Sequence, residues 1–318
     1  MSARAWAAFA AVSTLWGIPY LFIKVAVDDG VPPLFLAWAR VTLGAAVLLL
    51  VAWRAGVLGT LRGRWRPVAA YGVIEVCIPF PLIAAGEKHV ASSLAAILIA
   101  SVPLIIALLA LRFDHSERVG GRRLVGLLIG LGGVVALVGI DLSGRTDELV
   151  GAAAILVAAV GYAAAPLLIL KRHLSQLDPR ATMAGALLVA SVLLAPFAIA
   201  TPPSSMPSGN AIASLVVLGV FCTAAAFVFF GALIAEVGPS RASVITYVAP
   251  VVAVALGVTV LDERPGVGAV AGLLLILAGS WLSTDGRIPP AVAGAGAILR
   301  RRRPSRGRSL SPCTQSSE

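Results

Sequence analysis

Ten continuous apolar runs, each close to the length of a membrane span, follow one another along this chain of 318 residues. A helix needs about 20 apolar residues to cross the hydrocarbon core of a bilayer. The runs do not alternate between apolar and polar residues, as the strands of a membrane barrel do, so helices are the remaining way to satisfy the backbone in lipid. We predict spans at residues 5–27, 34–53, 67–86, 91–112, 122–140, 149–170, 181–200, 211–235, 241–261 and 266–283.

The composition excludes a water-soluble protein. Hydrophobic residues make up 59% of the chain and charged residues 13%, whereas soluble domains average about 45–50% and 25%. The predicted loops are short, so no catalytic domain fits between the spans. We therefore expect an all-α integral membrane protein rather than an enzyme, a nucleic-acid-binding domain or a disordered chain. The first run is too long for a signal peptide, and we expect it to be retained.

Basic residues divide unevenly between the two sides that these spans define. Segments 54–66 and 112–123 carry four arginines each, and both fall on the side of the N-terminus. Loops on the other side are acidic, as at Asp28–Asp29 and Asp262–Glu263. Because Lys-rich and Arg-rich loops stay in the cytoplasm, we predict a multi-pass protein of the cytoplasmic membrane with both termini cytoplasmic. The net charge of +10 is then mainly a topology signal.

The chain also repeats itself at an offset of about 147 residues. Residues 89–103 align without gaps on residues 236–250, which pairs Pro103 with Pro250. At an offset of 146, Glu117-Arg118 then matches Glu263-Arg264.

The repeating unit holds five spans. Because five is odd, the second copy must lie inverted in the membrane. The charges agree with this, because segment 54–66 carries four arginines and its partner, 201–210, carries none. We predict two inverted five-helix units, 5–140 and 149–283, followed by a basic, disordered cytoplasmic tail, 284–318. Inverted repeats are typical of secondary transporters.

Several of these motifs resemble a known family. They are Leu15-Trp16-Gly17, Phe22-Ile23-Lys24, Pro32-Pro33, Ala39-Arg40, Ser92-Ser93-Leu94, Pro239-Ser240-Arg241-Ala242-Ser243, and the matched Pro103, Pro250, Gly126, Gly272, Gly133 and Gly279. They are similar to the EamA proteins of the drug/metabolite transporter superfamily over about residues 5–283. The resemblance implies ten helices, two inverted repeats and transport of small metabolites or drugs, often export. Glu75 departs from the pattern, since an apolar residue is commoner there.

Glu75 is the sharpest candidate for a functional residue. It lies near the middle of the third span, and its repeat partner is Cys222. An ionised carboxylate at a helix centre costs about 2.5–3.5 kcal/mol to insert, so the side chain should face the interior. There it would accept a proton or pair with a cationic substrate. The alternative is a neutral Glu hydrogen-bonded to a neighbouring helix.

Two cations are candidate partners of Glu75. Arg40 lies inside the second span, and Lys24 lies near the outer end of the first. Each would pair with Glu75 or bind an anionic group. The alternative for Lys24 is that its ammonium reaches the membrane interface.

Aromatic residues and helix breakers complete the candidate set. Trp16, Tyr20 and Tyr247 would line a substrate cavity, with core packing as the alternative. We expect Pro103 and Pro250 to serve as hinges or packing residues. Gly126, Gly130 and Gly272 belong to small-residue spacings that let helices five and ten approach closely, or that form a homodimer contact.

The predicted function is a secondary transporter that moves a small metabolite or drug-like solute by alternating access, preferably outward. A phosphate-binding loop, a Ser/His/Asp constellation and metal-ligand spacing are missing from the sequence, so we expect no cofactor, no metal and no catalysis. The expected partners are the solute, the bilayer and a coupling proton. The alternatives are a carrier or flippase for lipid-linked groups and a non-transporting scaffold.

Overall fold

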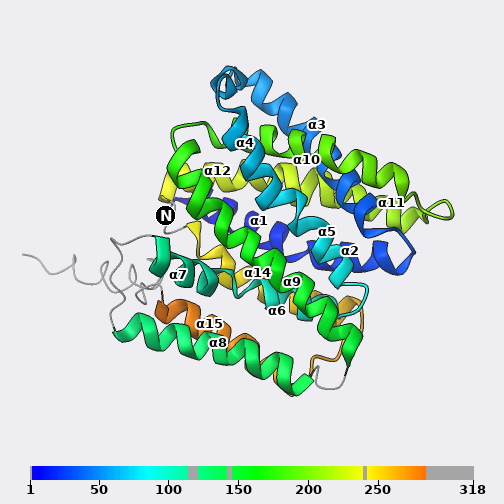
Figure 1. Cartoon of the computed structure of the whole chain (residues 1–318), viewed down its shortest axis with the longest axis vertical. Helices are drawn as coiled ribbons and strands as arrows, with labels where there is room; N and C mark the ends of the chain where they lie inside the picture. The colour runs from blue at the N-terminus through cyan, green and yellow to red at the C-terminus, as the bar shows by residue number, and fades with distance from the viewer. Residues whose placement is uncertain (1, 114–120, 142–144, 239–241, 284–318) are drawn as a thin grey trace, which may run out of the picture.

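The computed structural model describes residues 2–113, 121–141, 145–238 and 242–283, and every regular element within these ranges is a helix (Figure 1). Eight helical segments are long and apolar enough to cross a membrane, and two shorter apolar helices follow them. The prediction of an all-helical membrane protein is confirmed at this level. The predicted tail, 284–318, and the repeat match at Glu117 lie outside the described residues.

Most spans consist of more than one helical segment. In chain order the segments are α1 (Ala3–Gly17), α2 (Pro19–Asp28), α3 (Pro33–Arg54), η1 (Leu58–Leu61), α4 (Trp65–Gly72), η2 (Val73–Cys77), α5 (Pro79–Gly86), α6 (Ser92–Ile99), α7 (Val102–Phe113), α8 (Gly121–Asp141), α9 (Thr146–Ala165), η3 (Pro166–Leu174), α10 (Pro179–Ala200), α11 (Gly209–Val216), η4 (Val217–Ala225), α12 (Ala226–Val237), α14 (Ile245–Val260) and α15 (Val267–Ser283).

Three of these segments are π-helical, and proline accounts for two of them. Pro166 begins η3, and Pro79 begins α5, separated from the end of η2 by Ile78 alone. Proline lacks an N–H and its ring clashes with the carbonyl four residues earlier, so the regular hydrogen-bond ladder cannot continue through it. The third segment, η4, contains no proline. Segments η2 and η4 hold the two residues, Glu75 and Cys222, that the 147-residue offset pairs.

The two repeat-matched prolines differ in their helical setting. Pro103 lies in the first turn of α7, where a missing N–H leaves no carbonyl without a partner. Pro250 lies inside α14, where it removes one hydrogen bond. A hinge role shared by the two prolines stays a prediction.

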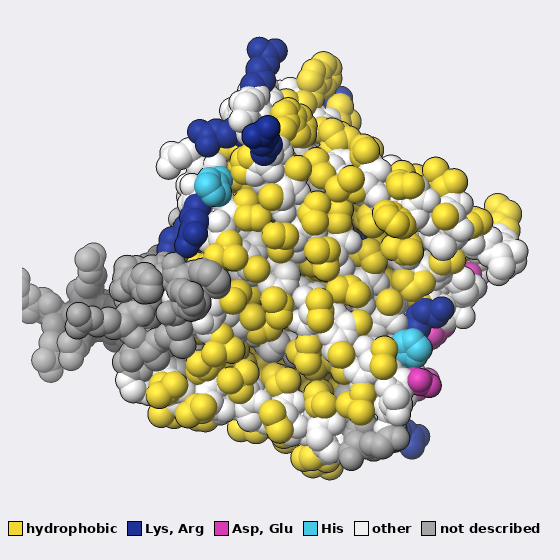
Figure 2. All heavy atoms as spheres, viewed as in Figure 1, with side chains coloured by type: hydrophobic (Ala, Val, Ile, Leu, Met, Phe, Trp, Pro, Cys, Tyr) yellow, Lys and Arg dark blue, Asp and Glu magenta, His cyan; other side chains and the backbone are white. Residues whose placement is uncertain are grey.

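The exposed surface carries the apolar belt expected of a membrane protein. Figure 2 shows hydrophobic side chains over the middle of this face, most Lys and Arg at the upper left, and Asp and Glu at the right. Large apolar side chains such as Val135, Ile199 and Val267 are more than two-thirds exposed. A protein with this surface would aggregate in water, whereas in a membrane the lipid chains cover the apolar side chains.

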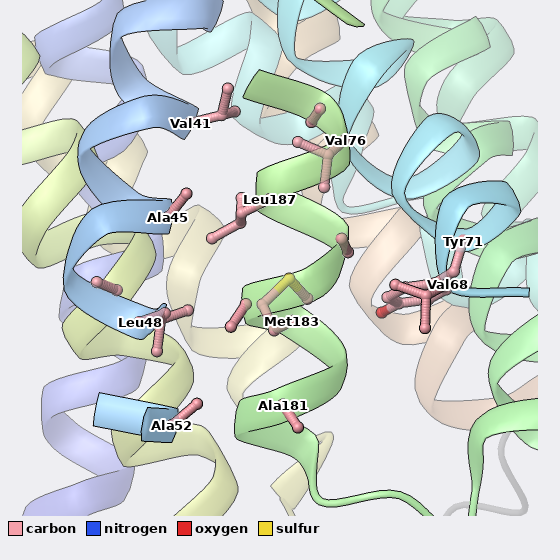
Figure 3. Packing of buried hydrophobic residues seen from close by; sticks show 14 of the residues in the cluster. Val41, Ala45, Leu48, Ala52, Val68, Tyr71, Val76, Ala181, Met183 and Leu187 are labelled. Atoms are coloured by element: carbon pink, nitrogen blue, oxygen red, sulfur yellow. The ribbon is translucent and has the colours of Figure 1, made fainter. Parts of the chain in front are cut away.

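The largest core cluster joins α3, α4 and α10. Figure 3 shows Val41, Ala45 and Leu48 of α3 opposite Met183 and Leu187 of α10. Alanine is frequent among the buried residues of this cluster, which lets the helix axes approach closely. This cluster holds α3, the helix that carries Arg40, against α10.

Helices α8 and α15 lie side by side along one edge of the bundle (Figure 1) and meet through glycines. A Cβ atom added at Gly126 would lie 2.5 Å from the main-chain nitrogen of Ser283, and one at Gly272 would lie 2.9 Å from the Gly133 oxygen. A Cβ at Gly130 would instead meet the side chain of Leu104 in α7. These glycines therefore serve contacts within one chain, and the homodimer stays a prediction.

We expect Gly279→Val to destabilise the protein, because its Cβ would lie 2.5 Å from the Gly126 oxygen of α8. Overpacking of this kind costs about 1–3 kcal/mol. The thermal unfolding midpoint of the purified protein in detergent measures the effect. Gly132→Val is the matched control, because a Cβ at Gly132 in α8 meets nothing within 4 Å. Equal midpoints for the two variants would contradict the proposed contact.

Candidate functional site

Arg40 of α3 is the central residue of the candidate site. Its side chain is buried, with 7% of the residue exposed. Its Nε donates a hydrogen bond of 3.0 Å to Oγ1 of Thr223, and its guanidinium carbon lies 4.1 Å from the centre of the Phe80 ring. Arg40 forms no ion pair with any carboxylate in the described part of the chain. The guanidinium is therefore a buried positive charge that no carboxylate contacts, although the buried Glu87 carboxyl acts on it over a longer distance.

Thr223 holds this guanidinium from the second half of the chain. Its hydroxyl donates to the main-chain oxygen of Leu218, 2.8 Å away and five residues earlier in η4. The hydroxyl proton is then committed to Leu218, so the lone pairs of Oγ1 are left to accept from Arg40. Gly44 and Gly219 allow the approach, because a Cβ at either position would press on the facing helix at 2.9 Å or less.

Aromatic residues from three more helices surround Arg40. Phe80 of α5 meets Tyr162 of α9 edge to face, with 6.5 Å between ring centres. Arg40 interacts electrostatically with the hydroxyls of Tyr162 and of Tyr20 in α2. The site therefore draws side chains from α2, α3, α5, α9 and η4, which come from both halves of the chain.

Glu75 also acts on Tyr162. Its carboxylate interacts electrostatically with the hydroxyls of Tyr71 and Tyr162, and its buried Oε2 has no hydrogen-bond partner. Gly161, the neighbour of Tyr162, lets α9 cross η2 closely, since a Cβ there would lie 2.7 Å from the Ile74 oxygen. Glu75 forms no ion pair with Arg40, so the pairing offered from the sequence is not present in this structure.

Lys24 is also not a partner of Glu75. Its Nζ lies 2.9 Å from the Asp28 carboxylate and donates to the main-chain oxygen of Glu87 at 3.1 Å. The side chain therefore lies at the end of the bundle where acidic residues gather, which we call the acidic end and define by Asp28, Glu87, Asp141 and Glu263.

Trp16, another aromatic candidate, packs in a different cluster from Arg40. Trp16 of α1 packs on Phe227 and Phe230 of α12, with ring centres 5.5 and 4.8 Å away. This is the core-packing alternative for Trp16. Tyr247 lies half-buried in α14.

Sequence reasoning overlooked Glu87 and the structural use of Glu263. Glu87 is fully buried, and neither of its carboxylate oxygens has a hydrogen-bond partner. Glu263 accepts hydrogen bonds of 2.7 and 2.9 Å from the backbone N–H groups of Ser92 and Ser93, so it caps the N-terminus of α6. The repeat match at Glu263 was a usable signal for a structural role. Glu87 gave none, because it lies next to an exposed Lys88 at the predicted end of a span.

The arrangement contains groups that can bind a ligand rather than a set of catalytic residues. Among the described residues, no three side chains of His, Cys, Asp or Glu come together as a metal would require. Instead, a buried cation that no carboxylate contacts and a buried carboxyl both act on one tyrosine, Tyr162. Such a site suits a small ligand that carries charge of both signs.

Comparison with known proteins gives a consistent result. A model of the EamA-like transporter family matches residues 4–139 and again 149–284. A solved crystal structure superposes with a TM-score of 0.65 at 26% identity, over 89% of this chain and 98% of that chain.

Three similar proteins are named as transporters or exporters. An uncharacterized transporter of Archaeoglobus fulgidus is 27% identical over 88% of this chain and 98% of its own length. The uncharacterized inner membrane transporter YedA of Escherichia coli is 31% identical, with coverage of 78% and 79%. A probable terminal-alkyne amino-acid exporter of Streptantibioticus cattleyicolor is 30% identical, with coverage of 89% and 93%.

Arg40→Met should raise the thermal unfolding midpoint of the ligand-free protein. The substitution removes a buried charge whose cost at a helix centre is about 3 kcal/mol, against a loss of about 1–2 kcal/mol for the ring contact with Phe80. Arg180→Met is the control, because Arg180 is paired with Asp178 at 2.8 Å and its loss should lower the midpoint slightly. A fall in the midpoint for Arg40→Met as large as that of a core truncation would show that the charge is compensated.

Proposed function

Because this chain belongs to the EamA-like transporter family, we propose that it is a secondary transporter that moves a small solute across the cytoplasmic membrane by alternating access, outward from the cytoplasm. Transport as such follows from the family and from the names of its relatives. The similar protein of Streptantibioticus cattleyicolor, a probable exporter, supports the outward direction.

The observation that carries the proposal is the buried Arg40 guanidinium, which no carboxylate contacts. A buried guanidinium that lacks a carboxylate raises the free energy of the empty protein. A solute with an anionic group would supply the missing counter-charge and accept a bidentate hydrogen bond from the guanidinium. Binding is then driven by a charge that the protein leaves unsatisfied, which makes Arg40 the anchor of the solute.

Glu75 supplies the second half of the recognition. Glu75 and Arg40 both act on Tyr162, so a zwitterion bound near Tyr162 would place its anionic group at Arg40 and its cationic group at Glu75. An α-amino acid has this charge distribution. The name of the Streptantibioticus relative, a probable amino-acid exporter, supports the same class of solute. When no solute is bound, Glu75 takes up a proton, which couples transport to a proton gradient.

Alternating access rests on two inverted halves, 5–140 and 149–283, with both termini in the cytoplasm. The double match of the family model supports the repeat. The π-helices η2 and η4, which hold residues 147 apart in sequence, support it from the backbone. Arginines at one end and carboxylates at the other support the orientation, since the arginine-rich end stays in the cytoplasm.

Glu75→Gln should abolish transport driven by a proton gradient while the protein still inserts and folds. The test is flux of a panel of radiolabelled amino acids through the purified protein in liposomes, with an imposed pH difference. We expect a loss of at least about tenfold, the effect of 1.4 kcal/mol of lost recognition. Glu148→Gln is the control, because Glu148 pairs only with Arg145 at the surface.

Normal proton-driven flux in Glu75→Gln would refute the role of Glu75. If the wild-type protein moves none of the amino acids but retains a lipid-linked compound through purification, it is a lipid carrier. If it moves no solute and retains none, the scaffold alternative holds.

A further inference from the structure

A second buried carboxyl, Glu87, lies at the acidic end and has no part in the function proposed above. It directly follows the span Trp65–Gly86, and the residue is fully buried. Neither carboxylate oxygen has a hydrogen-bond partner. Lys24, the nearest cation by contact, gives its hydrogen bond to the main-chain oxygen of Glu87 and its ion pair to Asp28. The Glu87 carboxyl is therefore enclosed but not neutralised by contact.

Charged groups on several elements act on Glu87, and the hydroxyl of Tyr20 in α2 also interacts with it. Lys24 and Asp28 lie on α2, Arg40 lies on α3, and Glu263 lies on the loop before α15. Burial is the largest influence and raises the pKa of the Glu87 carboxyl well above its usual range, with further rises from Glu263 and Asp28. Lys24 and Arg40 oppose this rise and do not cancel it. The neutral form is thus favoured while the acidic end is closed.

Glu263 explains why a second charge is excluded there. Its carboxylate is fixed by the N–H groups of Ser92 and Ser93, and its Oε2 fills the space left by Gly257, where a Cβ would lie 2.5 Å from that oxygen. The buried hydroxyl of Ser92 has no hydrogen-bond partner. Ionised Glu87 would add a negative charge near the carboxylates of Glu263 and Asp28, which disfavours its ionised form in addition to the larger effect of burial.

We propose that Glu87 is a proton-binding site that holds a proton while the acidic end is closed and releases it to water when that end opens. The step breaks the carboxyl O–H bond, transfers the proton to water and leaves a hydrated carboxylate. Opening of the acidic end is then favoured by high pH and closing by low pH. The proposal rests on the alternating access of the proposed function, but its tests require no solute.

The first test is the pH dependence of thermal unfolding in detergent. A carboxyl whose pKa is raised on folding binds more protons in the folded state than in the unfolded state. It therefore costs stability as the pH rises above the ordinary pKa of Glu, about 4.3, towards the raised value. We expect the unfolding midpoint of Glu87→Gln to lie about 2–4 °C above that of the wild type at pH 8, with the difference vanishing at pH 4.

Two controls keep this test decisive. Glu148→Gln should keep the wild-type pH dependence, because its carboxylate pairs at the surface. Glu87→Asp retains a titratable carboxyl, so it should keep the wild-type slope even if Glu87→Gln fails to fold. The proposal would be overturned if the unfolding midpoint of Glu87→Gln depended on pH as in the wild type, or if that of Glu87→Asp did not depend on pH.

The second test asks whether the proton controls opening. Hydrogen–deuterium exchange of the peptide that covers α6 reports on the Ser92 and Ser93 N–H groups bonded to Glu263. At pH 8 we expect this peptide to exchange severalfold faster in the wild type than in Glu87→Gln, and at pH 5 equally fast in both. Comparison at one pH cancels the intrinsic effect of pH on exchange. Equal exchange at both pH values would overturn the link between Glu87 and opening.

These outcomes separate the two proposals. Failure of amino-acid flux leaves the results on unfolding and exchange unchanged, so it would refute the proposed solute and not the proton site. If Glu87→Gln matches the wild type in both tests while flux is normal, the proton site at Glu87 is refuted and the proposed transport function is unaffected.

Discussion

The requirement that every buried backbone group finds a hydrogen-bond partner within the chain governs this structure. Lipid offers none, so the described residues form helices, and the ends of those helices need other donors and acceptors. At the acidic end carboxylates provide them. Glu263 caps α6, Asp141 accepts from Gly268 and Ala269 at the start of α15, and Asp29 accepts from Ser208 ahead of α11. Each of these bonds joins one half of the chain to the other.

The same requirement gives the interior its functional character. Where a helix changes to π-helical hydrogen bonding, side chains such as Thr223 take over carbonyl groups and become fixed in direction. Such segments are often found at functional sites. Here they position Arg40 and Glu75 near one tyrosine without pairing them. A chain selected only for stability would pair or remove these charges, so their separation is a cost that ligand binding recovers.

The sequence predicted the course of the spans well and the contacts of the site poorly. Run length and hydropathy located the helices to within a few residues, because the bilayer fixes both. The depth of Arg40 and Glu75 was also readable, since it depends only on position along a helix. The sequence could not show that Arg40 and Glu75 do not touch, because the direction in which each side chain points depends on η2, η4 and the tight helix crossing at Gly161. Glu87 was missed because a polar residue at the end of a span is ordinarily solvated, and its burial depends on tertiary packing that the sequence does not show.

The glycine contact between α8 and α15 also limits how the bundle can rearrange. The two backbones touch at Gly126, Gly133, Gly272 and Gly279, where Leu137 already packs on Gly272 and Leu275 on Gly133, so sliding one helix along the other would move these side chains from glycines onto larger residues. The register of this pair is therefore locked. We expect the pair to stay fixed while the helices around Arg40 shift, so that it acts as the stationary support against which any gating motion takes place.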